Sequence, residues 1–165
     1  KMNLILDSLD TPIGEMTAVF SGNALCYLDF SDCPDRLAGI LKKRFPIHEM
    51  KSKTNPGYIR DKVSAYFKGD VNAFEGVKLD TGGTVFQQSV WRALMKIPHG
   101  RTISYSELAE NVNNPKAVRA VGSANGQNPI AIIIPCHRVI ASTGALAGYA
   151  GGIERKQKLL ELEGA

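Results

Sequence analysis

Residues 132–139 read Ile-Ile-Ile-Pro-Cys-His-Arg-Val, and the rest of the predicted fold is arranged around them. The apolar run Ala131–Ile134 predicts a short buried strand, which Pro135 ends because a proline nitrogen has no hydrogen to donate. Cys136 would then lie at a strand end, followed at once by a histidine and an arginine. Cationic groups beside a thiol favour the nucleophilic thiolate. The stretch therefore predicts a reactive cysteine, and the alternative that it leaves open is a small buried hydrophobic side chain.

Length and composition limit the class of protein. The 165 residues, 44% of them hydrophobic, can form the core of one domain or of two small ones. The sequence has no apolar run long enough to span a membrane and no amino-terminal signal pattern. We therefore expect no membrane partner and a cytoplasmic protein if the source is bacterial, or a nuclear one if it is eukaryotic.

The three cysteines have no disulfide-framework spacing, so we expect free thiols. A zinc site from Cys26, Cys33 and His48 would lack the usual close pair of cysteines. We expect neither a bound metal nor a cofactor.

The positive charge is concentrated in the second half of the chain. The net charge is +4; residues 1–80 carry eleven Lys and Arg against eleven Asp and Glu, whereas residues 81–165 carry nine against five. A one-sided basic half favours a polyanionic partner such as nucleic acid, although the excess is modest.

The first half has the pattern of a small α/β domain. Three strand-like runs separated by turn residues predict an antiparallel meander, at Asn3–Leu9, Glu15–Ser21 and Ala24–Phe30. Pro34 and the pair Asn55-Pro56 each open a helical pattern, and Ile47–Lys51 is a candidate fourth strand. Residues 80–83 form the predicted boundary between an α/β domain over 1–80 and a mainly helical domain over 82–165.

The second half contains three predicted helices with clear starts. Thr84 with Gln87, and Ser104 with Glu107, have the spacing of capping boxes in which a hydroxyl and a side chain three residues later satisfy free amide groups. Asn113-Asn114-Pro115 then turns the chain into a third helix. Two short helices joined by a tight turn are the outline of a helix-turn-helix.

The outward face of the third helix is nearly bare. Lys116, Arg119 and Ser123 share this face, and Gly122 adds no side chain to it, so a large surface could approach the backbone closely. Proteins that enter the minor groove of DNA need such closeness. The alternative is an ordinary packed helix with one solvated arginine.

Five blocks of the sequence resemble the O6-alkylguanine-DNA alkyltransferases, also called methylated-DNA–protein-cysteine methyltransferases. The blocks are Ser104-Tyr105, Arg119–Gly122, Asn125–Pro129, Pro135–Val139 and Gly148–Gly152. Their order and spacing are kept from about Phe86 to Gly164. The first half is similar mainly in its length and its Thr-Pro-Ile-Gly turn at 11–14, and it lacks the cysteine and histidine pattern with which some members bind zinc. The resemblance implies an RNase H-like amino-terminal domain with a small antiparallel sheet, and a helical domain with a helix-turn-helix.

The resemblance also implies a suicide DNA-repair reaction. Cys136 would take the alkyl group from O6 of a flipped guanine and keep it as a thioether. His137 would act as its base through a water, and Glu163 would orient His137. Tyr105 would supply a proton to the guanine, and Asn128 would link the helix-turn-helix to the reactive segment. The residues themselves support one part: Ile153, Leu160 and Glu163 share a helical face, so the carboxylate is expected to point inward.

Other family roles concern the substrate. The positions that match base-binding residues are Val139, Tyr149, Ala150 and Lys156. Arg119 would fill the gap left by the flipped base, beside Lys116, Gly122 and Ser123 on the DNA. The implied partner is double-stranded DNA containing O6-alkylguanine, bound by a monomer through the minor groove.

Two other classes of function stay open. One is a non-catalytic module that binds alkylated DNA, whose family relatives replace the cysteine that this chain keeps. The other is a cysteine hydrolase, for which adjacent Cys and His on an extended backbone would point apart.

Overall fold

A four-stranded sheet forms the centre of the amino-terminal unit, which ends at Gly82, in this computed structural model describing residues 2–165. The strands are β1 (Met2–Leu9), β2 (Met16–Ser21), β3 (Ala24–Phe30) and β4 (His48–Ser52), and they lie in the order β3-β2-β1-β4. The first three pair antiparallel, as predicted, but β4 pairs parallel with β1. The prediction of an antiparallel sheet was therefore wrong for the fourth strand. The reason is that α1 (Pro34–Arg44) returns the chain to the end of the sheet where β3 begins, so β4 runs in the direction of β1 and β3.

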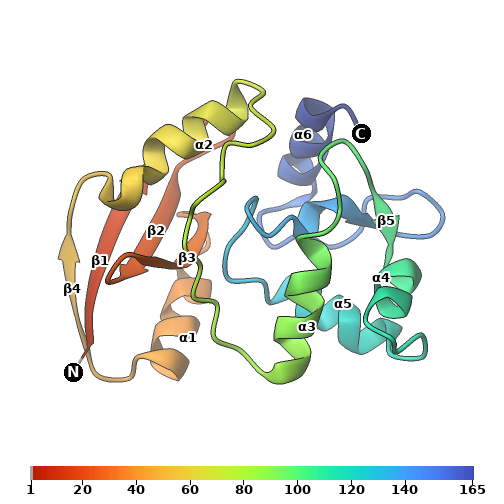
Figure 1. The fold of residues 1–165 in the computed structure, drawn as a ribbon, viewed down its shortest axis with the longest axis horizontal. Coiled ribbons are helices and arrows are strands. Elements are labelled where there is room, and N and C mark those ends of the chain that lie inside the picture. Colours follow the sequence, from red (N-terminus) through yellow and green to blue (C-terminus); the bar gives the residue numbers. More distant parts are fainter. Residues whose placement is uncertain (1) are drawn as a thin grey trace. The chain divides into compact units, whose positions relative to one another are not determined.

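Two helices cover opposite faces of this sheet (Figure 1). The apolar residues of α1 pack on a cluster that includes Leu4 of β1. Arg60, on α2 (Ile59–Phe67), donates hydrogen bonds to Asp7 of the same strand at 2.7 and 3.0 Å. Because side chains alternate along a strand, Leu4 and Asp7 point to opposite faces. A short 3-10 helix, η1 (Pro56–Tyr58), precedes α2.

The second unit, Gly83–Ala165, is mainly helical. Its helices are α3 (Val85–Leu94), α4 (Tyr105–Asn111), α5 (Val118–Gly126) and α6 (Ile153–Glu163), with a 3-10 helix η2 (Cys136–Arg138) and a two-stranded parallel sheet of β5 (Ile103–Ser104) and β6 (Val139–Ile140). Both predicted capping boxes are confirmed: the Thr84 and Ser104 hydroxyls accept hydrogen bonds from the backbone three residues on, at 3.0 and 3.1 Å.

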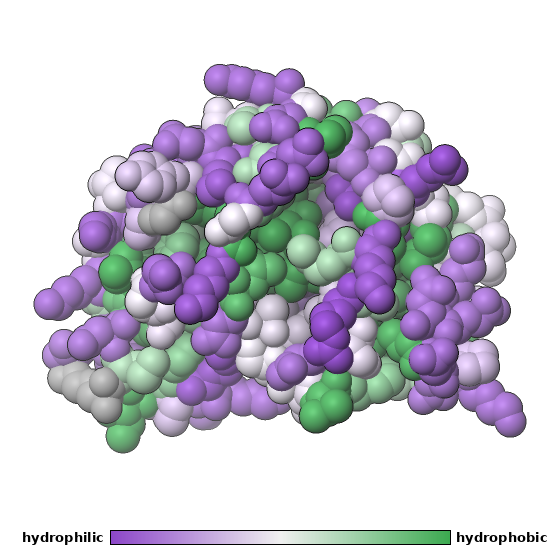
Figure 2. Space-filling model, viewed as in Figure 1, coloured by the Kyte–Doolittle hydropathy of each residue, from purple (hydrophilic) through white to green (hydrophobic). Residues whose placement is uncertain are grey.

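The core of this unit lies where α3, α4 and α5 meet. It contains Val90, Leu94, Leu108 and Val121, each fully buried. The indole of the buried Trp91 on α3 donates to the carbonyl of Ala124 on α5 at 2.9 Å, which fixes the two helices together. Figure 2 shows hydrophilic side chains, in purple, interspersed with hydrophobic ones, in green, on one face of the protein. No helix within residues 2–165 is long and apolar enough to cross a membrane.

Candidate active site

The segment that leads to Cys136 is a series of tight turns. Ile133 donates to the carbonyl of Ala131 at 2.8 Å, and Ile132 between them has a φ of +71°, which is rare for a β-branched residue. Pro135, at φ −83° and ψ 64°, forms an inverse γ-turn in which Cys136 donates to the carbonyl of Ile134 at 2.8 Å. The predicted strand Ala131–Ile134 was wrong. The whole run is buried, and a short buried apolar run does not by itself distinguish a strand from compact turns.

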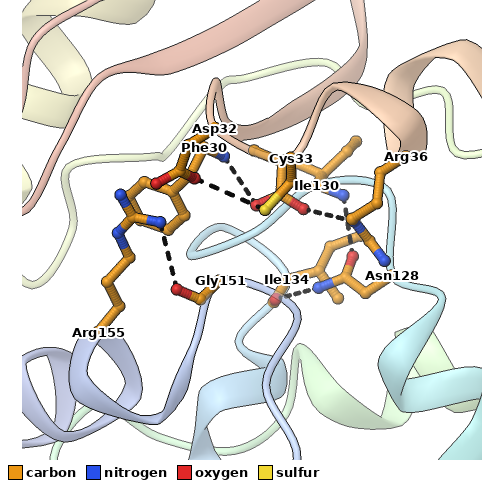
Figure 3. Close-up of polar contacts among 10 residues, drawn as sticks. Phe30, Asp32, Cys33, Arg36, Asn128, Ile130, Ile134, Gly151 and Arg155 are labelled. Carbon is orange, nitrogen blue, oxygen red and sulfur yellow. Dashed lines mark hydrogen bonds and ion pairs between the residues drawn. The ribbon is translucent and has the colours of Figure 1, made fainter.

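The side chain of Asn128 makes hydrogen bonds to the backbone of this segment, which forms turns rather than a strand (Figure 3). Its Nδ2 donates to the carbonyl of Ile134 at 2.7 Å, and its Oδ1 accepts from the backbone of Ile130 at 3.0 Å. Asn128 is 2% exposed and lies two residues after the end of α5. Asn128 thus ties the end of α5 to the segment that carries Cys136. The buried Asn125 also binds this segment, because its side chain donates to the carbonyl of Cys136 at 3.5 Å. It was not among the site residues predicted from the sequence.

Cys136 begins η2 and is 8% exposed. The next side chain, that of His137, is completely buried, and its Nε2 lies 2.8 Å from Oε2 of Glu163 on α6. The prediction that Glu163 points inward is confirmed, but Ile153, in the first turn of α6, is 43% exposed, so this face is not buried along its whole length. The face of α6 that is buried consists of Lys156, Leu159, Leu160 and Glu163.

The environment of His137 favours a neutral ring. Burial lowers the pKa of His137 below its usual value of 6.5, Glu163 opposes this shift, and the charges of Arg138 and Lys156 reinforce it. A carboxylate can only accept, so the ring proton belongs on Nε2. Nδ1 then carries a lone pair, and no hydrogen-bond partner lies near it within residues 2–165. The arrangement is a buried base with its acceptor nitrogen available.

Lys156 is fully buried, although a lone lysine on a helix is normally solvated. Its Nζ donates to the carbonyls of Val139, Ala147 and Gly148 at 2.6, 2.9 and 3.3 Å. Burial lowers the pKa of Lys156, and the charge of Cys136 opposes that shift. One ammonium group therefore fastens residues 147–148 of the loop before α6 to the start of β6.

Tyr105, the first residue of α4, also reaches that loop. Its hydroxyl donates to the carbonyl of Ala147 at 2.9 Å, so Ala147 accepts from both Tyr105 and Lys156. Burial raises the pKa of Tyr105, and the charge of Cys136 adds to the shift. A side chain at Gly122 would contact the Tyr105 ring at 3.7 Å, which places α5 directly against this tyrosine.

Other predicted site residues lie in the loop before α6 and at or on α5. Tyr149 is partly buried and Ala150 exposed, both in the loop before α6. Lys116, Arg119 and Ser123 are exposed at or on α5. Among residues 2–165, no group of three His, Cys, Asp or Glu side chains is placed to hold a metal ion.

Known proteins resemble this chain along most of its length. Residues 85–165 match the family model described as "6-O-methylguanine DNA methyltransferase, DNA binding domain". A methylated-DNA–protein-cysteine methyltransferase from Salmonella typhimurium is 42% identical, with 99% of this chain and 97% of the relative covered. The crystal structure of Mycobacterium tuberculosis O6-methylguanine methyltransferase has a TM-score of 0.83 at 43% identity, covering 98% of this chain and 93% of the other. The same M. tuberculosis protein in complex with DNA gives 0.81 at 44%, covering 98% and 92%.

Proposed function

Since this chain belongs to the methylated-DNA–protein-cysteine methyltransferase family, we propose that it repairs O6-alkylguanine in DNA by moving the alkyl group to Cys136. The observation that carries the proposal is the buried pair of His137 and Glu163 directly after this cysteine, with Nδ1 of the histidine open to accept a proton. A module that only binds alkylated DNA needs neither the thiol nor the base. The catalytic function is therefore favoured over the binding module.

The reaction is a single displacement. His137 accepts the thiol proton at Nδ1 through a water, and the sulfur of Cys136 attacks the alkyl carbon. The bond between that carbon and O6 breaks, and its electrons pass to the guanine, which takes up a proton from Tyr105. The thioether has no acyl carbon for water to attack, so the protein is consumed in one turnover.

The base-binding residues would line the pocket that receives the flipped guanine. We assign Val139, Tyr149, Ala150 and Lys156 to the walls of the guanine pocket. Tyr105 donates to the carbonyl of Ala147 in the structure, so it must exchange this acceptor for the base when it protonates guanine. Lys156 would keep its own bond to Ala147 during that exchange, and so hold the loop in place.

DNA would be held by α4 and α5 acting as a helix-turn-helix against the minor groove, with Arg119 taking the place of the flipped base. Support comes from the exposure of Lys116, Arg119 and Ser123 and from the absence of a side chain at Gly122. We further propose an RNase H-like relationship for the amino-terminal unit, monomeric action and a cytoplasmic location.

Stoichiometric alkylation of the protein tests this function. After incubation with duplex DNA containing O6-methylguanine, mass spectrometry of a proteolytic digest is expected to find one added methyl group, on the peptide that carries Cys136. DNA with unmodified guanine is the control. A protein mass that does not change while the methyl group persists in the DNA would contradict the proposal.

Replacing Arg119 should separate base flipping from chemistry. Flipping a base out of a duplex costs a few kcal/mol, and a free modified base carries no such cost. We expect Arg119→Ala to slow transfer from duplex DNA by about tenfold or more, and to leave transfer from free O6-benzylguanine nearly unchanged. Rapid-quench measurement of both rates checks this. Lys158→Ala removes the same charge from an exposed position on α6 and is the control. If Arg119→Ala slowed transfer equally on both substrates, Arg119 would have no role in base flipping.

A further inference from the structure

Arg138 makes the contacts of a residue that positions the catalytic pair. Its Nε donates to Oε1 of Glu163 at 2.8 Å, and one terminal nitrogen donates to Oε2 at 3.0 Å. The other terminal nitrogen donates to the carbonyl of Ile97, beyond the end of α3, at 2.7 Å. The guanidinium is planar, so these three bonds fix it with respect to both elements. The orientation of the Glu163 carboxylate follows from that of Arg138.

The Glu163 carboxylate accepts hydrogen bonds from His137 and Arg138, and of these two side chains only Arg138 carries a fixed positive charge. Its Oε2 accepts from both His137 and Arg138, and the Glu163 side chain has no exposure to water. A buried carboxylate with a neutral histidine as its sole partner would draw a second proton onto that histidine, since an ion pair is better than a lone buried charge. With Arg138 present, the carboxylate already has its counter-charge. His137 can then remain neutral while it donates from Nε2.

The charged groups that face His137 are few. Glu163 and Lys156 act on it from α6, and Arg138 acts on it from η2. Burial lowers the pKa of His137, Glu163 raises it, and Arg138 and Lys156 lower it further. Arg138 therefore acts in the direction that keeps the base ready. The sequence alone suggested that this arginine activates the thiol directly, but its donors are directed at Glu163 and Ile97.

We propose that Arg138 is a positioning residue of the transfer reaction: it holds the Glu163 carboxylate in the orientation that meets His137, and offsets its charge so that His137 stays a neutral base. This inference rests on the proposed function of the site. The inference adds a fourth residue to Cys136, His137 and Glu163, and this residue would set the pH range in which the transfer reaction runs.

The test compares pH profiles of single-turnover transfer from free O6-benzylguanine, which avoids any effect on DNA binding. Arg138→Met removes the charge and keeps the length of the side chain. It is expected to raise the pH at which transfer becomes half-maximal; for each unit of upward shift, the rate on the acidic side falls about tenfold. The His137 ring followed by NMR should show the same shift. Arg92→Met, an exposed arginine on α3, makes the same charge change and should leave the profile unaltered.

Arg138→Lys keeps the charge but cannot bind both carboxylate oxygens and the Ile97 carbonyl together. The pH of half-maximal transfer should stay near that of the wild type, and the maximal rate should fall. This variant also tests the inference if Arg138→Met does not fold. A midpoint that Arg138→Met leaves unchanged, or a maximal rate that Arg138→Lys leaves unchanged, would overturn the inference. If the wild-type protein transferred no alkyl group at all, the proposed function itself would be contradicted.

Discussion

Cys136→Ser is expected to abolish alkyl transfer while leaving DNA binding largely intact. A serine hydroxyl is a far weaker nucleophile than a thiol, and the neutral His137 beside it is too weak a base to ionise it. Cys136 is 8% exposed and lies at the start of η2, so one oxygen in place of its sulfur disturbs the packing little. The measurement is the amount of alkyl group moved per molecule of protein, together with the affinity for duplex DNA.

In the wild type, the amount transferred should reach a plateau at one alkyl group per protein molecule. Cys33→Ser, in the amino-terminal unit, is the matched control and should reach the same plateau. Product beyond one equivalent would indicate turnover, as in a hydrolase. Transfer that persists in Cys136→Ser would show that another residue receives the group.

Glu163→Gln should produce the second largest loss. The amide carries no charge, so Arg138 loses its counter-ion, and His137 can donate its Nε2 proton only to a neutral amide oxygen, which accepts more weakly than the carboxylate. At metal sites, loss of the partner that orients a ligating histidine costs about 10- to 100-fold in activity. Glu163 orients His137 in the same way, and we expect a fall in transfer rate of that size. The thiolate fraction of Cys136, followed by ultraviolet absorbance against pH, should fall as well.

Glu161→Gln provides the control for this substitution, because it makes the same change in charge on the same helix. Glu161 is exposed, and its hydrogen bond from Gln157 at 3.0 Å lies within α6. Its rate and titration should match the wild type. If Glu163→Gln also matched the wild type in both measurements, Glu163 would serve only to hold α6 in place.

Features decided by neighbouring residues were predictable from the sequence. Both capping boxes are local: the hydroxyl of Thr84 or Ser104 binds an amide only three residues away, so spacing alone predicts them. The inward direction of Glu163 was also predictable, since a helical face can be read from the sequence. The helical pattern also predicted that Ile153 would be buried, but this residue stands in the first turn of α6, where the helix face is exposed.

Features decided by distant residues were not predictable. The direction of β4 depends on how α1 crosses the sheet, and Ala131–Ile134 takes its turns with Asn128 as a hydrogen-bond partner. The partner of Arg138 is 25 residues away, and no pattern in the sequence pairs the two. The burial of Lys156 is of the same kind, because its three carbonyl partners come from a loop and a strand whose places only the fold determines.

The burial of Lys156 also makes this lysine a reporter of loop opening. Acylating reagents attack an amine that is unprotonated and accessible, and Lys156 is 0% exposed, with its donors bound to Val139, Ala147 and Gly148. The reagent can reach it only when the loop separates from β6, whereas Lys158 on the same helix is exposed in the closed structure. The ratio of the two labelling rates therefore measures how often the loop opens. Labelling before and after alkylation would show whether a spent molecule opens more often than a fresh one.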